Sequence, residues 1–464
     1  MSQPASLPKR RMGLKFLQII AISACLGIVL FVICLLAWER SGRQEEALQS
    51  VTRGWGGVQT LAGPALAIPY TLAEVGLDQN NKPRTTWKTR MILMTPDEVS
   101  VDAALAPEKR PLGIYEALVY TADISIKGRF TPPDLSSSGI REKDVRWDEA
   151  FIVLPIADTV GLTESPTLAL NGGKPETMAP GLHRMSNYNS KGVHIQTRGG
   201  FEGKPQEFSL RLKLRGSEAL YFQPVGRKMG MTLSTPWSSV SAVGQFLPLS
   251  LETGEKGSRA TWFIPSVAHG SAVAWTADEG SSIFENFPDS RYSIGKDSAW
   301  LGQVVGLRLW AGVDSYDSVV RSLKYGILFV GLTLLVLFLF EVVSRLRLHW
   351  TQYTLVGLAV CLFYLMLLSL SEHFAFGLSY LAAASGITAM VTLYAISVLG
   401  QRRRAGVLLF LLVALYTLFY LILKQEDYAL LMGSGLLFVA LAATMYLTRR
   451  IDWFDDAPEK PALR

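Results

Sequence analysis

Residues 16–38 read FLQIIAISACLGIVLFVICLLAW, a largely apolar stretch without a charged side chain. About 20 such residues suffice to cross the hydrocarbon of a bilayer as a helix. Basic residues between Lys9 and Lys15 precede the stretch, and no small-residue cleavage site follows it at Leu36–Arg40. The sequence therefore predicts an uncleaved membrane anchor at 16–38, behind a short N-terminal segment, 1–15.

The composition of the whole chain also indicates a membrane protein. Of its 464 residues, 49% are hydrophobic and only 18% are charged, whereas a soluble domain carries about 25% charged residues. Five further apolar runs of spanning length lie in the last third of the chain. We expect them to form a bundle of five transmembrane helices at 324–448. These runs are close to Tyr325–Val343, Tyr353–Leu370, Phe376–Leu399, Val407–Leu423 and Ala429–Leu447.

Arginine clusters in alternate loops set the predicted direction of the spans. Cytoplasmic loops of membrane proteins carry an excess of Lys and Arg. With the N-terminus in the cytoplasm, every cluster lies inside, whereas the reverse orientation would place all of them outside. The clusters lie at 345–347, 402–404 and 449–450. We therefore expect a multi-pass protein of a bacterial inner membrane, with the N-terminus and the tail 449–464 in the cytoplasm and 39–323 in the periplasm.

The long segment 39–323 shows the two-residue periodicity of β-strands. Apolar and polar side chains alternate in Tyr120–Lys127 and Phe208–Arg215, and more weakly in 229–233 and 305–309. This alternation is typical of strands with one buried face. The sequence therefore predicts a large all-β, sandwich-like domain inserted between the first and second spans.

At both ends of segment 39–323 the sequence pattern is typical of a helix. Glu39–Arg53 can continue the first span, and Asp314–Asp317 resembles a helix start with an acidic first turn. We expect two helical stalks there. All three cysteines lie in apolar runs, so no disulfide is predicted in the domain.

The charge distribution and the absence of known motifs limit the classes of function that the sequence allows. Segment 39–323 carries 30 of the 45 basic and 31 of the 39 acidic residues, so its net charge is −1 and the positive excess lies beside the spans. This distribution excludes a nucleic-acid partner and indicates the lipid bilayer instead. His183, His194 and His269 lack the spacing of a metal site, and no nucleotide-binding or hydrolase motif occurs. We therefore expect no cofactor, no metal and no enzymatic activity.

Ionisable residues in the spans are the best candidates for function, because a charge in hydrocarbon is costly. Glu341 lies about 24 Å along the second predicted span, near its inner end, where Arg345 can neutralise it. Ser371, Glu372 and His373 lie at the outer end of the third span. Small residues recur at 377–389 in the fourth span, and we expect them to allow close helix packing.

The cluster at 371–373 has three interpretations. It can be a hydrated helix end, part of a proton relay or ion site, or a contact that fixes the β-rich domain to the bundle. In the third, Glu372 pairs with a base near Arg321 or Lys324, and His373 donates a hydrogen bond. Ser371, Glu372, His373 and Glu341 are therefore the candidate functional or interdomain residues.

Segments spread over nearly the whole chain carry a family resemblance. The most specific are YTLVGLA at 353–359 and FYLMLLSLSEH at 363–373, together with WSSVSAVGQFLP at 237–248. In these segments the chain resembles the CreD family of inner-membrane, cell-envelope integrity proteins. The other matching segments are Gly63–Pro69, Ala260–Trp262, Asp314–Glu341 and Thr448–Trp453.

The resemblance implies an inner-membrane location and a role in envelope maintenance, under a sensor kinase and response regulator of the Cre type. It implies no reaction and no catalytic residue. The leading hypothesis is a non-enzymatic factor in cell-envelope integrity and stress response, which acts through a periplasmic or inner-membrane protein partner of the β-domain. The alternative is a transporter or membrane-embedded enzyme that uses the outer mouth of the five-helix bundle.

Overall fold

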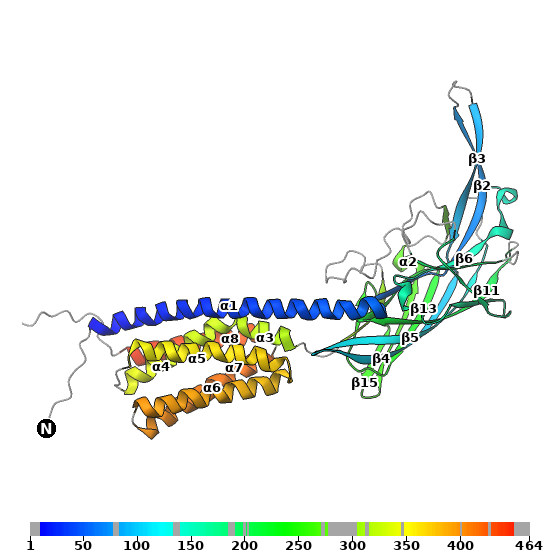
Figure 1. The fold of residues 1–464 in the computed structure, drawn as a ribbon. Helices are drawn as coiled ribbons and strands as arrows, with labels where there is room; N and C mark the ends of the chain where they lie inside the picture. Colours follow the sequence, from blue (N-terminus) through cyan, green and yellow to red (C-terminus); the bar gives the residue numbers. More distant parts are fainter. Residues whose placement is uncertain are drawn as a thin grey trace, which may run out of the picture. The chain divides into compact units, whose positions relative to one another are not determined.

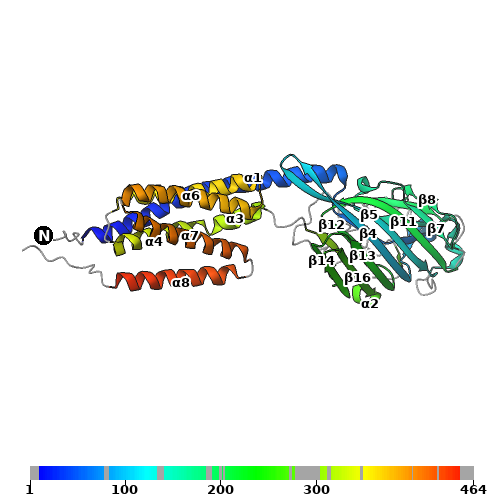
Figure 2. The same cartoon turned by 90° about the horizontal axis from the view of Figure 1, so that it is seen from below.

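The chain divides into two units, which are described separately. One contains Met1–Glu45 and Val313–Arg464, and the other contains Glu46–Gly312. Figures 1 and 2 show the helices of the first unit and the strands of the second. The computed structural model describes residues 10–77, 83–132, 140–183, 191–197, 201, 204–270, 274–276, 304–310, 315–344, 348–399, 401–425 and 428–449.

Among the described residues, six helices are long and apolar enough to cross a membrane, which confirms the predicted spans. The helix of the first span continues through Glu39–Arg53 without a break, as predicted. Asp314, the predicted helix start, lies outside the described residues. The helices are α1 (Arg10–Trp55), α4 (Gly326–Ser344), α5 (Trp350–Ser371), α6 (Phe376–Leu399), α7 (Arg402–Lys424) and α8 (Ala429–Thr448), and the shorter α3 (Ser315–Lys324) precedes α4.

Glycines let α1 pack closely against α4 and α5. A Cβ atom at Gly357 in α5 would lie 2.1 Å from Cδ1 of Leu26 in α1, so any side chain there would displace Leu26. Further along α5, the Sγ atom of Cys361 lies 3.9 Å from the carbonyl oxygen of Leu26. A Cβ atom at Gly27 would lie 2.8 Å from Cδ1 of Ile327 in α4. Close approach through small residues is the usual packing of membrane helices.

Aromatic rings form the centre of the helical unit. The ring of Phe329 in α4 lies 4.5 Å from that of Phe419 and 4.9 Å from that of Tyr416, both in α7. The ring of Phe363 in α5 lies 5.1 Å from that of Tyr416 and 5.3 Å from that of Tyr380 in α6. Such pairs contribute about 0.5–1.5 kcal/mol each beyond their buried area. This aromatic cluster therefore holds α4, α5, α6 and α7 together.

The described strands of the second unit form three sheets. Most of their buried apolar side chains belong to one hydrophobic core. The eight-stranded sheet has the order β15 (Ser250–Gly254), β16 (Gly257–Pro265), β13 (Lys228–Thr235), β4 (Glu98–Leu112), β5 (Tyr115–Phe130), β11 (Gln206–Ser217), β7 (Thr167–Leu170) and β8 (Glu176–Thr177). The six-stranded sheet has the order β17 (Ala274–Thr276), β3 (Pro83–Met94), β2 (Ala65–Leu77), β6 (Phe151–Pro155), β10 (Gly192–Gln196) and β9 (Ala179–Pro180).

A four-stranded sheet and several short helical turns complete the second unit. The sheet has the order β1 (Gln59–Ala62), β12 (Ala219–Gln223), β18 (Val305–Leu309) and β14 (Val240–Gly244). The turns are η2 (Glu142–Asp144), η3 (Trp147–Glu149), η4 (Thr159–Gly161) and α2 (Ser266–His269).

The predicted strand segments all lie in strands. The strongest two are in β5 and β11, which pair antiparallel with Ile124 opposite Leu212. Both of these side chains are buried, whereas the adjacent Asp123 and Lys213 are exposed, as the pleat of a half-buried strand requires. The weaker segments lie in β13 and β18. The structure thus confirms a sheet-rich domain between the first and second spans.

Trp55 packs the end of α1 against the sheets of the second unit. The Cζ atoms of Arg110 and Arg215 lie 3.5 Å and 4.2 Å from its ring centroid. Its indole N–H donates to the carbonyl of Tyr120, with a nitrogen-to-oxygen distance of 3.5 Å. The buried Tyr120 hydroxyl in turn donates to the carbonyl of Ala219 at 2.8 Å, and burial raises the pKa of Tyr120 well above its ordinary value. These contacts fix the last turn of α1.

β2 and β3 form a long hairpin that extends beyond the other strands of this unit (Figure 1). Its base pairs with β6 at Ala65–Ala67 and with β17 at Ile92–Met94. Further out, where Ala73 lies opposite Trp87, no third strand of the described chain pairs with it. The outer residues of β3, Arg84–Thr89, are all exposed. We call this part, which consists of Thr71–Leu77 and Pro83–Thr89, the outer hairpin.

Candidate functional site

The carboxylate of Glu372 lies where three helical segments of the first unit meet. Its Oε1 accepts a hydrogen bond from the hydroxyl of Tyr316 in α3, and the two oxygens are 3.1 Å apart. Nη1 of Arg40, in α1, lies 3.8 Å from the same carboxylate oxygen. Glu372 itself directly follows α5. We call these residues the Arg40–Tyr316–Glu372 cluster, because one carboxylate joins α1, α3 and the end of α5.

The two contacts of the carboxylate differ in strength. The side chain of Arg40 is 42% exposed, and an ion pair in contact with water contributes about 0–1 kcal/mol. A hydrogen bond to a charged group, such as that from Tyr316, contributes about 1.5–3 kcal/mol. The sequence analysis expected Glu372 to contact the stalk near Arg321 and Lys324 and to pair with a base. In the structure Glu372 contacts the stalk helix α3 through Tyr316, and Arg40 is the base beside it.

The two neighbours of Glu372 have different surroundings. Ser371 is buried, and its hydroxyl donates to the carbonyl of Leu368 at 2.8 Å, so it satisfies the backbone of its own helix. His373 is exposed, and its side chain has no hydrogen bond or ion pair in the described part of the chain. Of the three candidates at 371–373, the structure therefore brings only Glu372 into a polar cluster.

Glu341 is buried near the end of α4, with 6% of its surface exposed. Its Oε2 accepts a hydrogen bond from the hydroxyl of Tyr353 at 2.5 Å, and its Oε1 accepts one from the backbone N–H of Leu348 at 3.2 Å. Arg345, the partner expected from the sequence, lies outside the described residues. Glu341 thus holds the start of α5 against α4 from within the helical unit.

The two carboxylates do not share one site. Tyr353, the partner of Glu341, lies near the start of α5, whereas Glu372 follows its end. This separation along the helix amounts to about 28 Å. Paired catalytic carboxylates lie within about 10 Å of each other. The geometry therefore gives no acid–base pair, and each carboxylate instead connects helices at one end of the unit.

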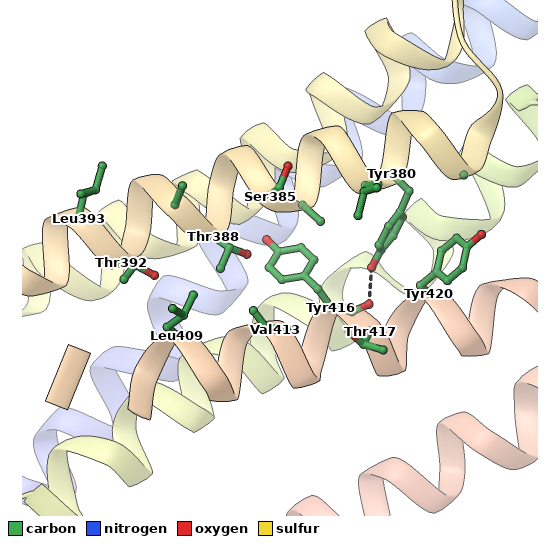
Figure 3. Close-up of a pocket in the computed structure, with 14 residues that line it drawn as sticks. Tyr380, Ser385, Thr388, Thr392, Leu393, Leu409, Val413, Tyr416, Thr417 and Tyr420 are labelled. Atoms are coloured by element: carbon green, nitrogen blue, oxygen red, sulfur yellow. Dashed lines mark hydrogen bonds between the residues drawn. The ribbon is translucent and has the colours of Figure 1, made fainter. Parts of the chain in front are cut away.

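A groove between α6 and α7 was not predicted from the sequence. It has a volume of about 720 Å³, and Figure 3 shows the side chains along its walls. Tyr380 reaches from α6 to α7, where its hydroxyl donates to the carbonyl of Tyr416 at 2.7 Å. Hydroxyl side chains recur along both walls at helical spacing, and they belong to Ser385, Thr388, Thr392, Tyr416, Thr417 and Tyr420. We call this feature the α6–α7 groove.

The sequence does contain a signal for this groove, which is the four-residue spacing of hydroxyl side chains in α6 and α7. Thr388 and Thr392 are four residues apart, as are Tyr416 and Tyr420, so each pair lies on one helix face. The small residues at 377–389 obscured this signal, because the sequence analysis assigned them to close packing. Several of them line the groove instead.

The histidines of the second unit make structural contacts. Nδ1 of His194 lies 2.8 Å from the carbonyl oxygen of Gly181, and the rings of His183 and His194 stack with their centroids 4.9 Å apart. Nε2 of His269 lies 3.0 Å from the carbonyl oxygen of Gly226, and burial lowers the pKa of His269. Within the described ranges, no three side chains of the metal-ligating types gather at one point.

Comparison with known proteins places the chain among inner-membrane proteins. The sequence model of the family described as "Inner membrane protein CreD" matches residues 11–454. The inner membrane protein CreD of Escherichia coli K12 is 30% identical over 420 residues, which are 90% of this chain and 88% of that protein. The similarity therefore extends over both units.

A similarity to a solved structure is much weaker. The crystal structure of a candidate protease from Parabacteroides distasonis aligns with 50% of this chain and 43% of its own, at 11% identity and a TM-score of 0.22. A TM-score this low supports no conclusion about fold or function.

Proposed function

The chain belongs to the CreD family of inner-membrane proteins, and we propose that it is a non-enzymatic factor in cell-envelope integrity and stress response. In this proposal it acts by binding a periplasmic protein partner through its β-rich unit. The observation that carries the proposal is the outer hairpin of β2 and β3, whose exposed residues Arg84–Thr89 include Trp87.

The outer hairpin has the features of a protein-binding surface. Trp87 keeps 64% of its surface exposed, and Trp and Arg are the residues that most often dominate binding energy. A two-stranded hairpin is only marginally stable by itself in water, and its open strand edges can pair with another chain. We infer that a partner strand or pocket covers this part of β3.

The side chain of Trp87 indicates the chemistry of the partner. Trp87 lies an odd number of residues from Arg84, so the two side chains are on opposite faces of β3. A partner with an apolar pocket would complement the exposed Trp87.

The predicted orientation supports a partner in the periplasm. The arginine clusters at 402–404 and 449–450 favour a cytoplasmic side for those loops. The segment between α1 and α3 then lies on the other side of the inner membrane, where envelope components are accessible to the outer hairpin.

Site-specific photo-crosslinking in living cells tests the proposal. A photoreactive phenylalanine analogue replaces Trp87 in one strain and Phe263 in another. Phe263 lies in β16 and is also an exposed aromatic residue, with 54% of its surface exposed. We expect a discrete crosslinked protein from position 87 and none from position 263.

A functional measurement accompanies the crosslinking. Trp87→Ala should sensitise cells to a detergent to the same degree as deletion of the whole chain. Cells with Phe263→Ala should tolerate the detergent as well as the wild type does. Normal tolerance of the Trp87→Ala strain, together with no crosslink at position 87, would refute the hairpin as the binding surface.

A further inference from the structure

We propose that the α6–α7 groove binds a neutral lipid, with long apolar chains and carbonyl or ester oxygens but no charged headgroup. The groove belongs to the helical unit, so this proposal does not depend on the partner of the β-rich unit. Four properties of the groove identify the ligand class: the charge of its lining, its unpaired hydroxyls, their depth in the bilayer and its shape.

The lining of the groove requires an uncharged ligand. Its fourteen lining residues are all described, and none of them is Asp, Glu, Lys, Arg or His. Apolar side chains such as Leu381, Leu393 and Val413 alternate with the hydroxyl groups. A charged group within the hydrocarbon needs an opposite charge or water beside it, and this lining offers no opposite charge.

Two hydroxyl groups of the groove lack a hydrogen-bond partner among the described residues. They are the buried hydroxyls of Tyr416 and Thr392. Tyr416 is only 4% exposed, and Figure 3 shows its ring extending from α7 towards Thr388 of α6. Because no water is available in hydrocarbon, an unpaired hydroxyl there is costly. A carbonyl or ester oxygen of a ligand in the groove would accept the bond that Tyr416 can donate.

The depth of these hydroxyls separates neutral lipids from phospholipids. Tyr416 lies about 12 Å before the end of α7 at Lys424, and Thr392 lies about 10 Å before the end of α6 at Leu399. Both therefore lie well inside a hydrocarbon layer of about 30 Å. The charged headgroup of a phospholipid stays at the water boundary and keeps its ester oxygens there. A lipid without that charge can place its oxygens deeper.

The length and volume of the groove fit a lipid chain. Its α6 wall runs from Gly377 to Leu393, which is about 24 Å. Cavities of about 300–1,000 Å³ usually hold small-molecule ligands. A flexible lipid chain is therefore a suitable occupant.

Photolabelling of the full chain in lipid nanodiscs tests the proposal. The probe is a diacylglycerol with a diazirine in one acyl chain. We expect labelled peptides from α6 and α7, and Tyr416→Phe should lower the labelling about tenfold, as the loss of one hydrogen bond predicts. Tyr364→Phe is the matched control, because the Tyr364 hydroxyl is also buried and without a partner among the described residues, but it does not line the groove. Its labelling should equal that of the wild type.

Competition distinguishes a neutral lipid from a phospholipid, and cysteine crosslinking distinguishes it from a second copy of the chain. Unlabelled diacylglycerol should displace the probe, whereas phosphatidylglycerol with the same chains should not. Equal displacement by both would overturn the neutral-lipid assignment. Ala389 lines the groove, so an Ala389→Cys variant of a cysteine-free chain should stay monomeric under oxidation. A disulfide-linked dimer, or undiminished labelling of Tyr416→Phe, would also overturn the proposal.

Discussion

The hydroxyl oxygen of Tyr353 lies 2.5 Å from Oε2 of Glu341. Both residues belong to helices that are long and apolar enough to cross a membrane, where an unpaired carboxylate is costly. The backbone N–H of Leu348 donates to the other carboxylate oxygen at 3.2 Å. This one side chain therefore links the end of α4 to the first turn of α5 and to Leu348, two residues before that helix.

Removing the Tyr353 hydroxyl should destabilise the helical unit. Tyr353→Phe removes the hydroxyl that donates a hydrogen bond to the buried carboxylate of Glu341, which should cost about 1–3 kcal/mol. The melting temperature in detergent measures the effect. Tyr394→Phe, at a position on α6 that is 37% exposed, is the control and should melt like the wild type. Identical melting temperatures for both variants would contradict the proposed role of the hydrogen bond.

Neutralising Glu372 should loosen α3. Glu372→Gln removes the ion pair with Arg40 and weakens the bond from Tyr316, so we expect faster proteolysis between residues 310 and 325. Tyr316→Phe should reproduce the effect, and Arg40→Gln should have a smaller one, since exposed ion pairs contribute little. His373→Ala is the matched control and should leave the cleavage rate unchanged, because His373 is exposed.

The variant Glu372→Gln also separates the structural role of Glu372 from the alternative hypothesis of a transporter or membrane-embedded enzyme. If Glu372 serves a transporter or a membrane-embedded enzyme, Glu372→Gln should abolish activity while the cleavage rate stays that of the wild type. Unchanged proteolysis together with an unchanged envelope phenotype would exclude both roles and leave Glu372 as a hydrated helix end.

The orientation of the chain makes a separate prediction. In a variant without Cys25, Cys34 and Cys361, single cysteines in place of Gly280 and Glu426 should react with a membrane-impermeant thiol reagent in intact cells. A cysteine in place of Arg403 should react only after permeabilisation, because positively charged loops stay in the cytoplasm. Labelling at position 403 in intact cells would reverse the topology.

Local patterns in the sequence predicted the elements, because a span or a half-buried strand is encoded within a few consecutive residues. The partners of the candidate carboxylates needed the tertiary structure. For Glu341 the sequence offered Arg345 on the same helix, whereas the structure adds Tyr353 from the next helix. For Glu372 it offered bases in the adjoining stalk. Arg40 comes close only because α1 packs beside α5, where Leu26 meets Gly357.

The α6–α7 groove was missed for a related reason. Ser385 and Ala389 are small, and small residues in a span usually indicate a helix contact. Whether a small residue faces a neighbouring helix or an open groove depends on the crossing of two helices, which periodicity does not encode. The hydroxyls of Thr388 and Tyr416 can be recognised as parts of one groove only when the positions of α6 and α7 are known.

Acidification should weaken the β-rich unit through His269. Nε2 of His269 lies 3.0 Å from the carbonyl oxygen of Gly226, which requires a proton on Nε2, so the neutral ring already makes this bond. Burial disfavours the charged ring and lowers the pKa of His269 in the folded protein, although the carbonyl partly opposes the shift. In the unfolded chain the pKa is about 6.5.

Between the folded and the unfolded pKa, the unfolded state binds more protons, so the free energy of unfolding rises with pH. The contribution of His269 is therefore complete above about pH 6.5 and falls as the pH drops towards the lower, folded pKa. Urea unfolding of the full chain in detergent, followed by tryptophan fluorescence, measures this dependence. His269→Gln keeps a donor for the Gly226 carbonyl but cannot titrate, so its unfolding should depend less on pH below 6.5. If wild type and variant lose stability equally on acidification, other groups cause the loss, and burial of His269 has no energetic consequence.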